Sequence, residues 1–483
     1  MKKIFVLLIL INTISFSQEK FSDFISKIYQ ESGTDGKTAL VDSFIIANQP
    51  NGIPYIEDST AYFIYRGNGS SVKIAGDFNG WSPQLNLSRL SGTDLWYKGQ
   101  KFEMNARVDY KIVVDDQNWY LDPLNPNTVS GGYGPNSELA MPEYVQPEEV
   151  IRNENIPHGT IERISVSSSI LNRTYRVDVY LPPNYESSED VYPSAYVHDG
   201  SEYLTLGSAP NVIDNLLYEK KLSPFIGIFV TPTDRGDEYA YGNRYNYAQF
   251  IAEELVPKID AMYRTSKQRE DRLVLGTSLG GNISGLISYN YHEVFGKCGM
   301  HSSALWVNNM EVYNNYVDNP KIDLDLYAVW GTYENVYEYM RPLKDTLLSK
   351  GYNMGWTEYP EGHSWGLWRA TLDDMFLYFF PNGYTNSEDE EILPTRIKLN
   401  QNYPNPFNPE TTIEYEIPNL NVTSVRLSLY NVLGKEIKTL INEKQSPGIH
   451  KVTFNGNNLS SGVYFYTLKT PVAQLTKKMI LIK

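Results

Sequence analysis

The sequence predicts a multidomain protein in which a central α/β domain, with a mainly parallel sheet covered by helices on both faces, is flanked by two β-rich regions. Three observations lead to this fold class. The chain has 483 residues, which is too long for one hydrophobic core and suggests about three domains. Apolar residues recur with a period of two towards both ends, whereas strand-like and helical patterns alternate in the middle. Apolar residues make up 41% and charged residues 20%, the balance of a globular protein.

Residues 1–17 carry the parts of a secretory signal peptide: a Met-Lys-Lys start, an apolar run from Ile4 to Ile11, and the small-x-small sequence Ser-Phe-Ser that ends at Ser17. The apolar run is shorter than the roughly 20 residues that span a bilayer, so we expect cleavage near Ser17 and no transmembrane segment. A buried N-terminal helix is the alternative interpretation of residues 1–17.

Residues 18–54 show helical spacing interrupted by glycines, which predicts a short helical segment.

Residues 55–145 change to a period of two, in short segments separated by Gly, Asn and Pro, and this pattern predicts a small β-sandwich. Residues 150–382 alternate strand-like and helical segments, which predicts the mainly parallel sheet. Residues 383–395 contain an acidic run and are interpreted as a linker. Residues 396–483 return to short alternating strands and predict a second small β-sandwich.

The charge and cysteine content exclude several function classes. A net charge of −15 argues against nucleic acid or anionic lipid as a partner, because their phosphates would be repelled. Cys298 is the single cysteine, so the chain can form neither an intrachain disulfide nor a cysteine-based zinc or Cys-x-x-Cys redox site. We also expect no metal and no cofactor.

The stretch Gly276-Thr-Ser-Leu-Gly280 matches Gly-x-Ser-x-Gly, a pattern too short to be specific by itself. Its surroundings are informative: Leu273-Val-Leu275 supplies an apolar strand, and a helical pattern begins directly after Ser278. Strand, tight turn and helix are the nucleophile elbow of α/β-hydrolases, so we expect this fold for the central domain and a nucleophilic Ser278. The alternative is a serine that merely lies between glycines.

A serine nucleophile needs a base and an orienting acid, which follow it in this fold in the order acid, then histidine. Of the six histidines, only His363 follows a further predicted strand and precedes the final helix. The acid is expected on the loop after the strand that ends at Gly331, where Glu334 is the first carboxylate and Glu338 the fallback.

The oxyanion hole needs two backbone N–H groups. Leu279 is expected to supply one, and the loop at Gly200 and Ser201 the other. Residues 236–246 are a candidate wall of the acyl pocket, although their three tyrosines, Tyr239, Tyr241 and Tyr245, are equally compatible with an ordinary surface, the interpretation we favour.

Six motifs in the central domain resemble the esterase D and enterochelin-esterase group of α/β-hydrolases, which includes the feruloyl and acetyl-xylan esterases of carbohydrate esterase family 1. They are Val179–Tyr185, Tyr192–Gly200, Glu254–Ile259, Gly276–Gly281, Gly331–Glu334 and Gly362–Arg369, in the family's order over about 220 residues. The resemblance implies a Ser278–Glu334–His363 triad. Family members often have Asp where this chain has Glu334.

Residues Gly76–Trp81, Tyr110–Asp115 and Trp119–Pro123 resemble glycogen-binding and branching-enzyme modules, carbohydrate-binding module family 48, which have an immunoglobulin-like E-set sandwich. The resemblance implies sugar contacts at Trp81, Lys111 and Trp119; an aromatic face can stack on a sugar and an amine can donate to its hydroxyls. The alternative is a packing domain in which Phe78 and Trp81 fill the core.

The last region is similar to the C-terminal sorting domain of type IX secretion cargo, through Gln401–Thr412, Leu429–Lys435, Gly462–Tyr466 and Lys477–Ile480. The resemblance implies type IX machinery as a partner, export across the outer membrane, release or surface attachment, and removal of the tail.

Together these features predict a secreted serine esterase that acts on acylated polysaccharide or oligosaccharide, with feruloyl or acetyl esters of plant hemicellulose as substrates. A siderophore trilactone esterase of the enterochelin type is one alternative. A surface glycan-binding protein with an inactive hydrolase domain is another.

Overall fold

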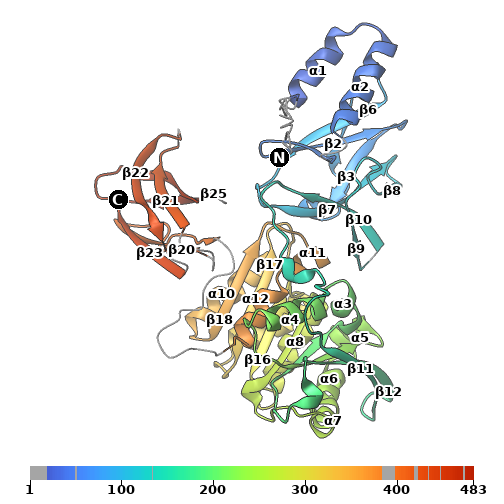
Figure 1. The fold of residues 1–483 in the computed structure, drawn as a ribbon, viewed down its shortest axis with the longest axis vertical. Helices are drawn as coiled ribbons and strands as arrows, with labels where there is room; N and C mark the ends of the chain where they lie inside the picture. The colour runs from blue at the N-terminus through green and yellow to red at the C-terminus, as the bar shows by residue number, and fades with distance from the viewer. Residues whose placement is uncertain are drawn as a thin grey trace, which may run out of the picture. The chain divides into compact units, whose positions relative to one another are not determined.

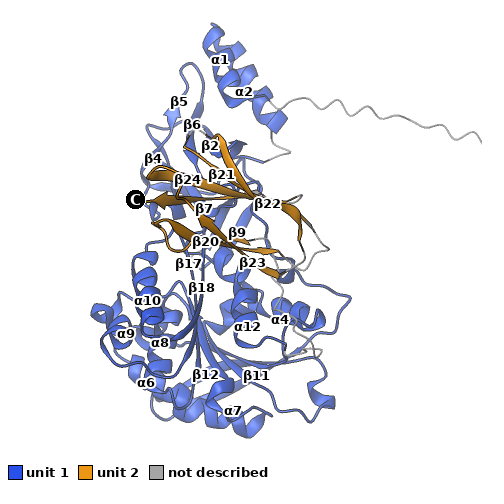
Figure 2. Cartoon of the chain, turned by 90° about the vertical axis from the view of Figure 1, so that its left-hand side faces the viewer, with its two compact units in different colours: residues 1–382 blue, residues 383–483 orange. Residues whose placement is uncertain are grey.

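The computed structural model describes residues 19–48, 52–132, 134–382, 398–417, 423–432, 434–445, 448–470 and 474–483. The chain forms two compact units, residues 1–382 and 383–483, which Figure 2 colours separately. The predicted signal peptide, residues 1–17, and the predicted linker, residues 383–395, lie outside the described residues.

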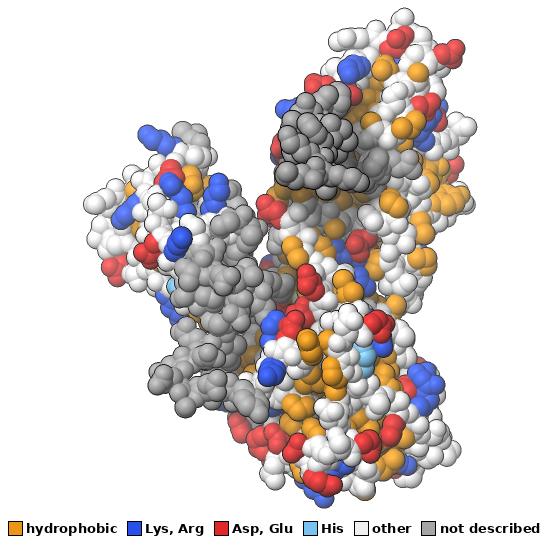
Figure 3. All heavy atoms as spheres, viewed as in Figure 1, with side chains coloured by type: hydrophobic (Ala, Val, Ile, Leu, Met, Phe, Trp, Pro, Cys, Tyr) orange, Lys and Arg blue, Asp and Glu red, His pale blue; other side chains and the backbone are white. Residues whose placement is uncertain are grey.

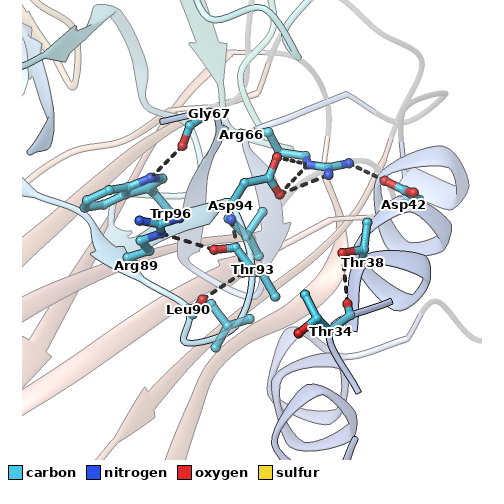
Figure 4. A network of polar contacts seen from close by, with 11 residues as sticks. Thr34, Thr38, Asp42, Arg66, Gly67, Arg89, Leu90, Thr93, Asp94 and Trp96 are labelled. Atoms are coloured by element: carbon cyan, nitrogen blue, oxygen red, sulfur yellow. Dashed lines mark hydrogen bonds and ion pairs between the residues drawn. The ribbon is translucent and has the colours of Figure 1, made fainter. Parts of the chain in front are cut away.

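Two helices, α1 (Phe21–Gln30) and α2 (Thr34–Asn48), open the first unit. Their buried apolar residues share one cluster with Tyr55, Ile64 and Leu95 of the following β region, so the predicted helical segment packs on the strands after it. Figure 4 shows the polar part of this contact: Arg66 Nη2 lies 2.9 Å from Asp94, while Arg66 Nη1 pairs with Asp42 of α2.

The β region that follows, residues 55–140, contains two sheets with the strand orders β1–β2–β6–β5 and β4–β3–β7–β10–β9, with β8 paired to β7. One apolar cluster draws on both sheets, through Phe63 of one and Ile74, Val108 and Ile112 of the other. The strands are β1 (Tyr55–Glu57), β2 (Thr60–Arg66), β3 (Val72–Gly76), β4 (Leu85–Asn86), β5 (Ser88–Arg89), β6 (Leu95–Lys101), β7 (Arg107–Val114), β8 (Asn118–Tyr120), β9 (Thr128–Gly131) and β10 (Gly134–Ala140).

The central sheet has eight strands in the order β11–β12–β14–β13–β15–β16–β17–β18. Figure 1 labels β11 and β12 at one end of the domain and β16, β17 and β18 among the other strands. β11, β12 and β14 pair antiparallel, and all pairs from β14 to β18 are parallel. In chain order the strands are β11 (Thr160–Ser168), β12 (Arg173–Leu181), β13 (Ser194–His198), β14 (Ile226–Thr231), β15 (Arg272–Thr277), β16 (Lys297–His301), β17 (Asp325–Gly331) and β18 (Asn353–Tyr359).

Helices cover both faces of this sheet, which confirms the predicted α/β domain. Along β15, Val274 joins the apolar core beneath α8, α9 and α10, whereas Leu273 and Leu275 join the core beneath α4 and α12. Both faces of the strand are therefore buried, as its continuous apolar sequence requires. The helices are α3 (Gly200–Thr205), α4 (Ala209–Tyr218), α5 (Arg235–Tyr239), α6 (Arg244–Gln249), α7 (Val256–Met262), α8 (Leu279–Asn290), α9 (Val307–Asp318), α10 (Tyr337–Ser349), α11 (Trp365–Ala370) and α12 (Leu372–Phe379).

The second unit contains two sheets, β19–β20–β23 and β22–β21–β24–β25, and one apolar cluster draws on both through Ile413, Val425, Tyr466 and Met479. The strands are β19 (Lys398–Leu399), β20 (Glu410–Ile417), β21 (Thr423–Tyr430), β22 (Glu436–Gln445), β23 (Gly448–Asn455), β24 (Gly462–Lys469) and β25 (Gln474–Leu481). Basic and acidic side chains are interspersed over the described surface drawn in Figure 3.

Candidate active site

Ser278 lies in a tight turn between β15 and α8, at the C-terminal edge of the parallel strands. Its backbone has φ 56° and ψ −116°, a conformation that a non-glycine residue adopts only under strain. The Ser278 N–H donates to the His301 carbonyl at 2.9 Å, and the Ser278 carbonyl accepts from the Ala304 N–H at 3.0 Å. These bonds hold the turn so that the hydroxyl projects beyond the strand ends, as the elbow motif predicts.

The glycines around Ser278 leave room for close backbone packing. A Cβ placed on Gly276 would lie 2.5 Å from the Gly280 carbonyl carbon, and one on Gly281 would lie 2.2 Å from Ser303 Oγ. Both distances are far below van der Waals contact. The spacing of the motif is therefore required by the packing of α8 against β15 and against the loop after β16.

His363 and Glu334 complete a hydrogen-bonded chain with the serine. His363 Nε2 lies 2.9 Å from Ser278 Oγ, and His363 Nδ1 bonds to Glu334 Oε2. The imidazole packs edge-on against Trp368, with ring centroids 5.0 Å apart and an interplanar angle of 88°. The structure thus brings together the three side chains that the sequence predicts for nucleophile, base and acid.

Glu334 is buried on the loop after β17, and its second oxygen is also engaged. Glu334 Oε1 accepts from the Gly331 N–H at 2.5 Å and from Ser302 Oγ at 2.7 Å. The Trp368 indole N–H donates to the same Ser302 Oγ at 2.9 Å. Glu338, the fallback acid, is exposed in the first turn of α10. The geometry therefore favours Glu334 as the carboxylate that orients His363.

The other histidines of the first unit have different environments. Burial lowers the pKa of His198 and of His301 to about 3, and each ring bonds to a buried tyrosine hydroxyl. His158 Nδ1 lies 2.9 Å from Asp214, and His292 Nδ1 lies 3.0 Å from the Tyr289 carbonyl. Among the described residues, His363 is the histidine whose ring is bonded to Ser278.

The predicted oxyanion donors open two helices at neighbouring strand ends. Leu279 begins α8 after β15, and Gly200 and Ser201 begin α3 after β13. β13 and β15 are adjacent and parallel, with Val197 opposite Leu275. N–H groups in the first turn of a helix have no intrahelical acceptor and remain available to a negative oxygen.

An ion pair that the sequence analysis missed ties these two turns together. Arg235 donates to both carboxylate oxygens of the buried Asp199, each at 2.8 Å, and to the Thr277 carbonyl at 3.1 Å. The Asp199 N–H donates to Tyr239 Oη at 3.1 Å. Tyr239 is fully buried, so the surface interpretation is wrong for this tyrosine, whereas Tyr241 and Tyr245 are exposed. In the sequence, the position of Asp199 directly before the predicted donor Gly200 was the one signal that could have pointed to this ion pair.

Of the three predicted sugar-contacting residues, Lys111 lies on β7 and Trp119 on the paired β8, whereas Trp81 lies in the turn after β3. Trp119 on β8 is 44% exposed and lies opposite Val113, so Trp119 and the half-buried Lys111 share one face of the sheet. Trp81 instead donates its indole N–H to Asp77 Oδ1 at 2.9 Å. Its polar edge is therefore already engaged within the protein.

No group of three or more His, Cys, Asp or Glu side chains in the described part of the chain is arranged to hold a metal ion. Within the same residues, no helix has the length and apolar character needed to cross a membrane.

Comparison with known proteins identifies two regions of the chain. Residues 168–379 match the family described as putative esterase, and residues 401–483 match the secretion system C-terminal sorting domain. The chain therefore carries an esterase-family domain, and its sorting domain indicates secretion or a cell-surface location.

Two curated relatives are similar to this chain over part of their length. An uncharacterized protein of Bacillus subtilis, YbbA, is 28% identical over 28% of this chain and 58% of its own. The endo-1,4-beta-xylanase/feruloyl esterase of Xylanibacter ruminicola is 24% identical over 59% of this chain and 40% of its own. This chain thus spans about half the length of these two relatives.

Among solved structures, the enterobactin esterase of Shigella flexneri has a TM-score of 0.58 at 19% identity, covering 67% of this chain and 94% of that one. That similarity shows a shared fold. The 67% of this chain that the structural similarity covers is a larger part than residues 168–379, which match the esterase family. The fold similarity therefore extends beyond the esterase domain.

Proposed function

We propose that the chain is a secreted serine esterase that hydrolyses carboxylic esters on acylated polysaccharide or oligosaccharide, preferentially feruloyl or acetyl esters of plant hemicellulose. The observation that carries the proposal is the hydrogen-bonded chain from Ser278 Oγ through His363 to Glu334, with 2.9 Å between the hydroxyl and the imidazole. The esterase-family match and the relative named as a xylanase/feruloyl esterase support the reaction class and the substrate class.

In the first half-reaction, Ser278 Oγ attacks the ester carbonyl carbon while its proton moves to His363 Nε2. Glu334 accepts the hydrogen bond from His363 Nδ1 and stabilises the imidazolium. The backbone N–H of Leu279, with that of Gly200 or Ser201, receives the negative charge on the carbonyl oxygen. The sugar hydroxyl then leaves with the proton from His363, and the acyl group remains on Ser278.

In the second half-reaction, a water molecule gives a proton to His363 Nε2 and attacks the acyl carbon. The resulting oxyanion uses the same donors. Collapse of the intermediate returns the proton to Ser278 Oγ and releases the carboxylic acid. Every proton transfer runs through one imidazole, which is why its orientation by Glu334 matters in both halves.

Two loops beside Ser278 supply an aromatic wall for the acyl group. Tyr241 is 59% exposed and Trp306 is 45% exposed. Ala240, next to Tyr241, and Val307, next to Trp306, share a small apolar cluster with Leu279. Arg244 Nε of α6 lies 2.7 Å from Glu311 of α9, which links the helices that follow the two loops. Exposed aromatic faces beside a nucleophile suit a planar aromatic acyl group, and this favours a feruloyl over an acetyl ester.

A trilactone esterase of the enterochelin type is the second candidate, favoured by the fold shared with the enterobactin esterase over 94% of that chain. The sorting domain, which directs the protein outward, favours an extracellular polymer instead. A glycan-binding protein without activity is the third candidate, and the hydrogen-bonded Ser278 and His363 argue against it.

The test compares the wild type, Ser278→Ala and the control Ser349→Ala, an exposed serine of α10, on methyl ferulate, acetylated xylan and a siderophore trilactone. We expect wild-type turnover of methyl ferulate or acetylated xylan, a loss of at least about 10⁴-fold in kcat for Ser278→Ala, and no change for the control. Preference for the trilactone would replace our substrate assignment. Absence of turnover on all three esters would favour the binding protein.

A further inference from the structure

The turn that carries His363 contacts the N-terminal β region as well as the esterase domain. We propose that the N-terminal β region is part of the catalytic apparatus and that Arg107 is a positioning residue which holds His363 at Ser278. The inference rests on the proposed esterase function and assigns the β region a role within the same site.

The backbone of the turn is bound to β7. The Arg107 N–H donates to the Pro360 carbonyl at 3.1 Å, and Arg107 and Glu361 form a parallel β-bridge. α11, which begins two residues after His363, lies against β9 (Figure 1). The segment before His363 and the helix after it therefore both contact the N-terminal β region.

The Arg107 side chain also binds the turn, through its guanidinium group. It is fully buried, and its Nη1 donates to Ser364 Oγ at 2.9 Å. Its Nη2 lies 2.7 Å from Asp109 and 2.7 Å from Glu138. These two carboxylates set the orientation of the planar guanidinium, so the remaining donor reaches Ser364, the residue next to His363, from a rigid base.

Two glycines of the turn are explained by this contact. A Cβ on Gly362 would lie 1.9 Å from Asp77 Cγ, and a Cβ on Gly366 would lie 1.8 Å from Arg107 Nη1. Neither glycine has a positive φ, so the constraint is space rather than backbone conformation. The segment Gly362–Gly366 thus packs so closely against the N-terminal β region that its two glycine positions have no room for a Cβ atom.

Asp77, which fills the space beside Gly362, is itself fixed within the β region. Its carboxylate accepts from the Trp81 indole N–H at 2.9 Å and from the Asp109 N–H at 2.7 Å. Asp109 in turn pairs with Arg107. Trp81, expected from the sequence to contact sugar, therefore belongs to the network that supports the histidine turn.

The loop that carries Glu334 is anchored to the same region. Tyr333, the preceding residue, packs its ring 5.8 Å from Phe102, and its hydroxyl donates to Glu103. The Tyr333 N–H donates to the Glu361 carbonyl at 3.0 Å, which joins the acid loop to the histidine turn. Ser278 is held by the central sheet, whereas residues next to His363 and Glu334 also contact the β region.

A displacement of about 1 Å between reacting groups can reduce turnover by about 100-fold, so loosening this turn affects the proton transfer more than substrate binding. Arg107→Ala would leave the buried Asp109 and the half-buried Glu138 without this cation and would destabilise the fold. The informative variants are Arg107→Lys, which keeps the charge but not the planar fork, and Ser364→Ala, which removes only the acceptor. Arg66→Lys is the matched control, because Arg66 also pairs with two carboxylates in the N-terminal part of the chain.

The readouts are kcat and KM on the best ester and the second-order rate of Ser278 labelling by a small fluorophosphonate, which needs the histidine but no sugar or acyl subsite. Thermal midpoints verify folding. For Arg107→Lys and Ser364→Ala we expect kcat and the labelling rate to fall together by about 10-fold to 100-fold, with KM within twofold of wild type. Arg66→Lys should have the same kcat, KM and labelling rate as the wild type.

Labelling rates and kcat within twofold of wild type in both Arg107→Lys and Ser364→Ala would overturn the positioning role and leave Arg107 as a structural residue. A wild type that labels at Ser278 but hydrolyses no ester would overturn the proposed function alone, and the labelling rates would still decide the role of Arg107. A wild type that does not label at all would overturn both.

Discussion

Replacing Glu361 by Gln should change how the stability of the first unit depends on pH. Glu361 is buried beside the histidine turn, and one oxygen of its carboxylate has no hydrogen-bond partner in the described structure. Burial raises the pKa of Glu361 to about 8, although Arg107 and Arg369 oppose this effect. A glutamine has the same shape as the protonated acid and never ionises.

The raised pKa sets the sign of the effect. Between the ordinary pKa of 4.5 and about 8, the folded protein keeps a proton that the unfolded chain releases. Folding stability therefore falls with rising pH across this window, by up to about 1.4 kcal/mol per pH unit. Above pH 8 the accumulated loss is about 5 kcal/mol, a large fraction of the stability of a typical domain.

The measurement is denaturant unfolding of wild type and Glu361→Gln at pH 5, 6, 7 and 8. We expect nearly equal stabilities at pH 5 and a growing advantage of the variant towards pH 8. Glu338→Gln, an exposed glutamate, is the control and should follow the wild type. Parallel curves for wild type and Glu361→Gln across this range would refute the assignment of a protonated, buried Glu361.

Two further substitutions test the site and the N-terminal module. Glu334→Gln should lower kcat about 10⁴-fold by disturbing the His363 tautomer, whereas Glu338→Gln should leave kcat unchanged; the reverse result would move the acid to Glu338. Trp119→Ala should abolish retardation of the protein in xylan or glycogen affinity gels without unfolding it, since the side chain is 44% exposed. Trp356→Ala, another exposed tryptophan, is the control, and equal retardation of all three proteins would rule out sugar binding at Trp119.

The fold of the central domain was readable because its signals are local. The apolar segment Leu273–Leu275 lies within β15, as predicted, and the strand that we expected to end at Gly331 is β17. Met262 departs from the regular helical pattern: helical spacing places it on one face with Leu255 and Ile259, yet it is 50% exposed. Residues Phe250–Leu255 form a π-helical segment, whose wider turns change the angular register of the residues that follow.

The residues of the candidate site could be predicted from the sequence only where the order of motifs along the chain leaves one candidate. Ser278 follows from the elbow pattern, and His363 from its position after the last strand and before the final helix. Glu334 and Glu338 could not be separated by order, because both follow the same strand. Only the packing, which buries Glu334 against His363 and leaves Glu338 exposed, distinguishes them.

The sequence by itself determined the α/β class and the sorting tail, and it predicted the elbow serine and the candidate histidine, because these depend on local patterns and on order along the chain. The tertiary structure decided which groups hold the site in place. Arg107 and Ser364 are 257 residues apart in the chain and 2.9 Å apart in space. A contact of that kind leaves no periodicity or spacing in the sequence, since it depends on how the N-terminal β region packs against the esterase domain.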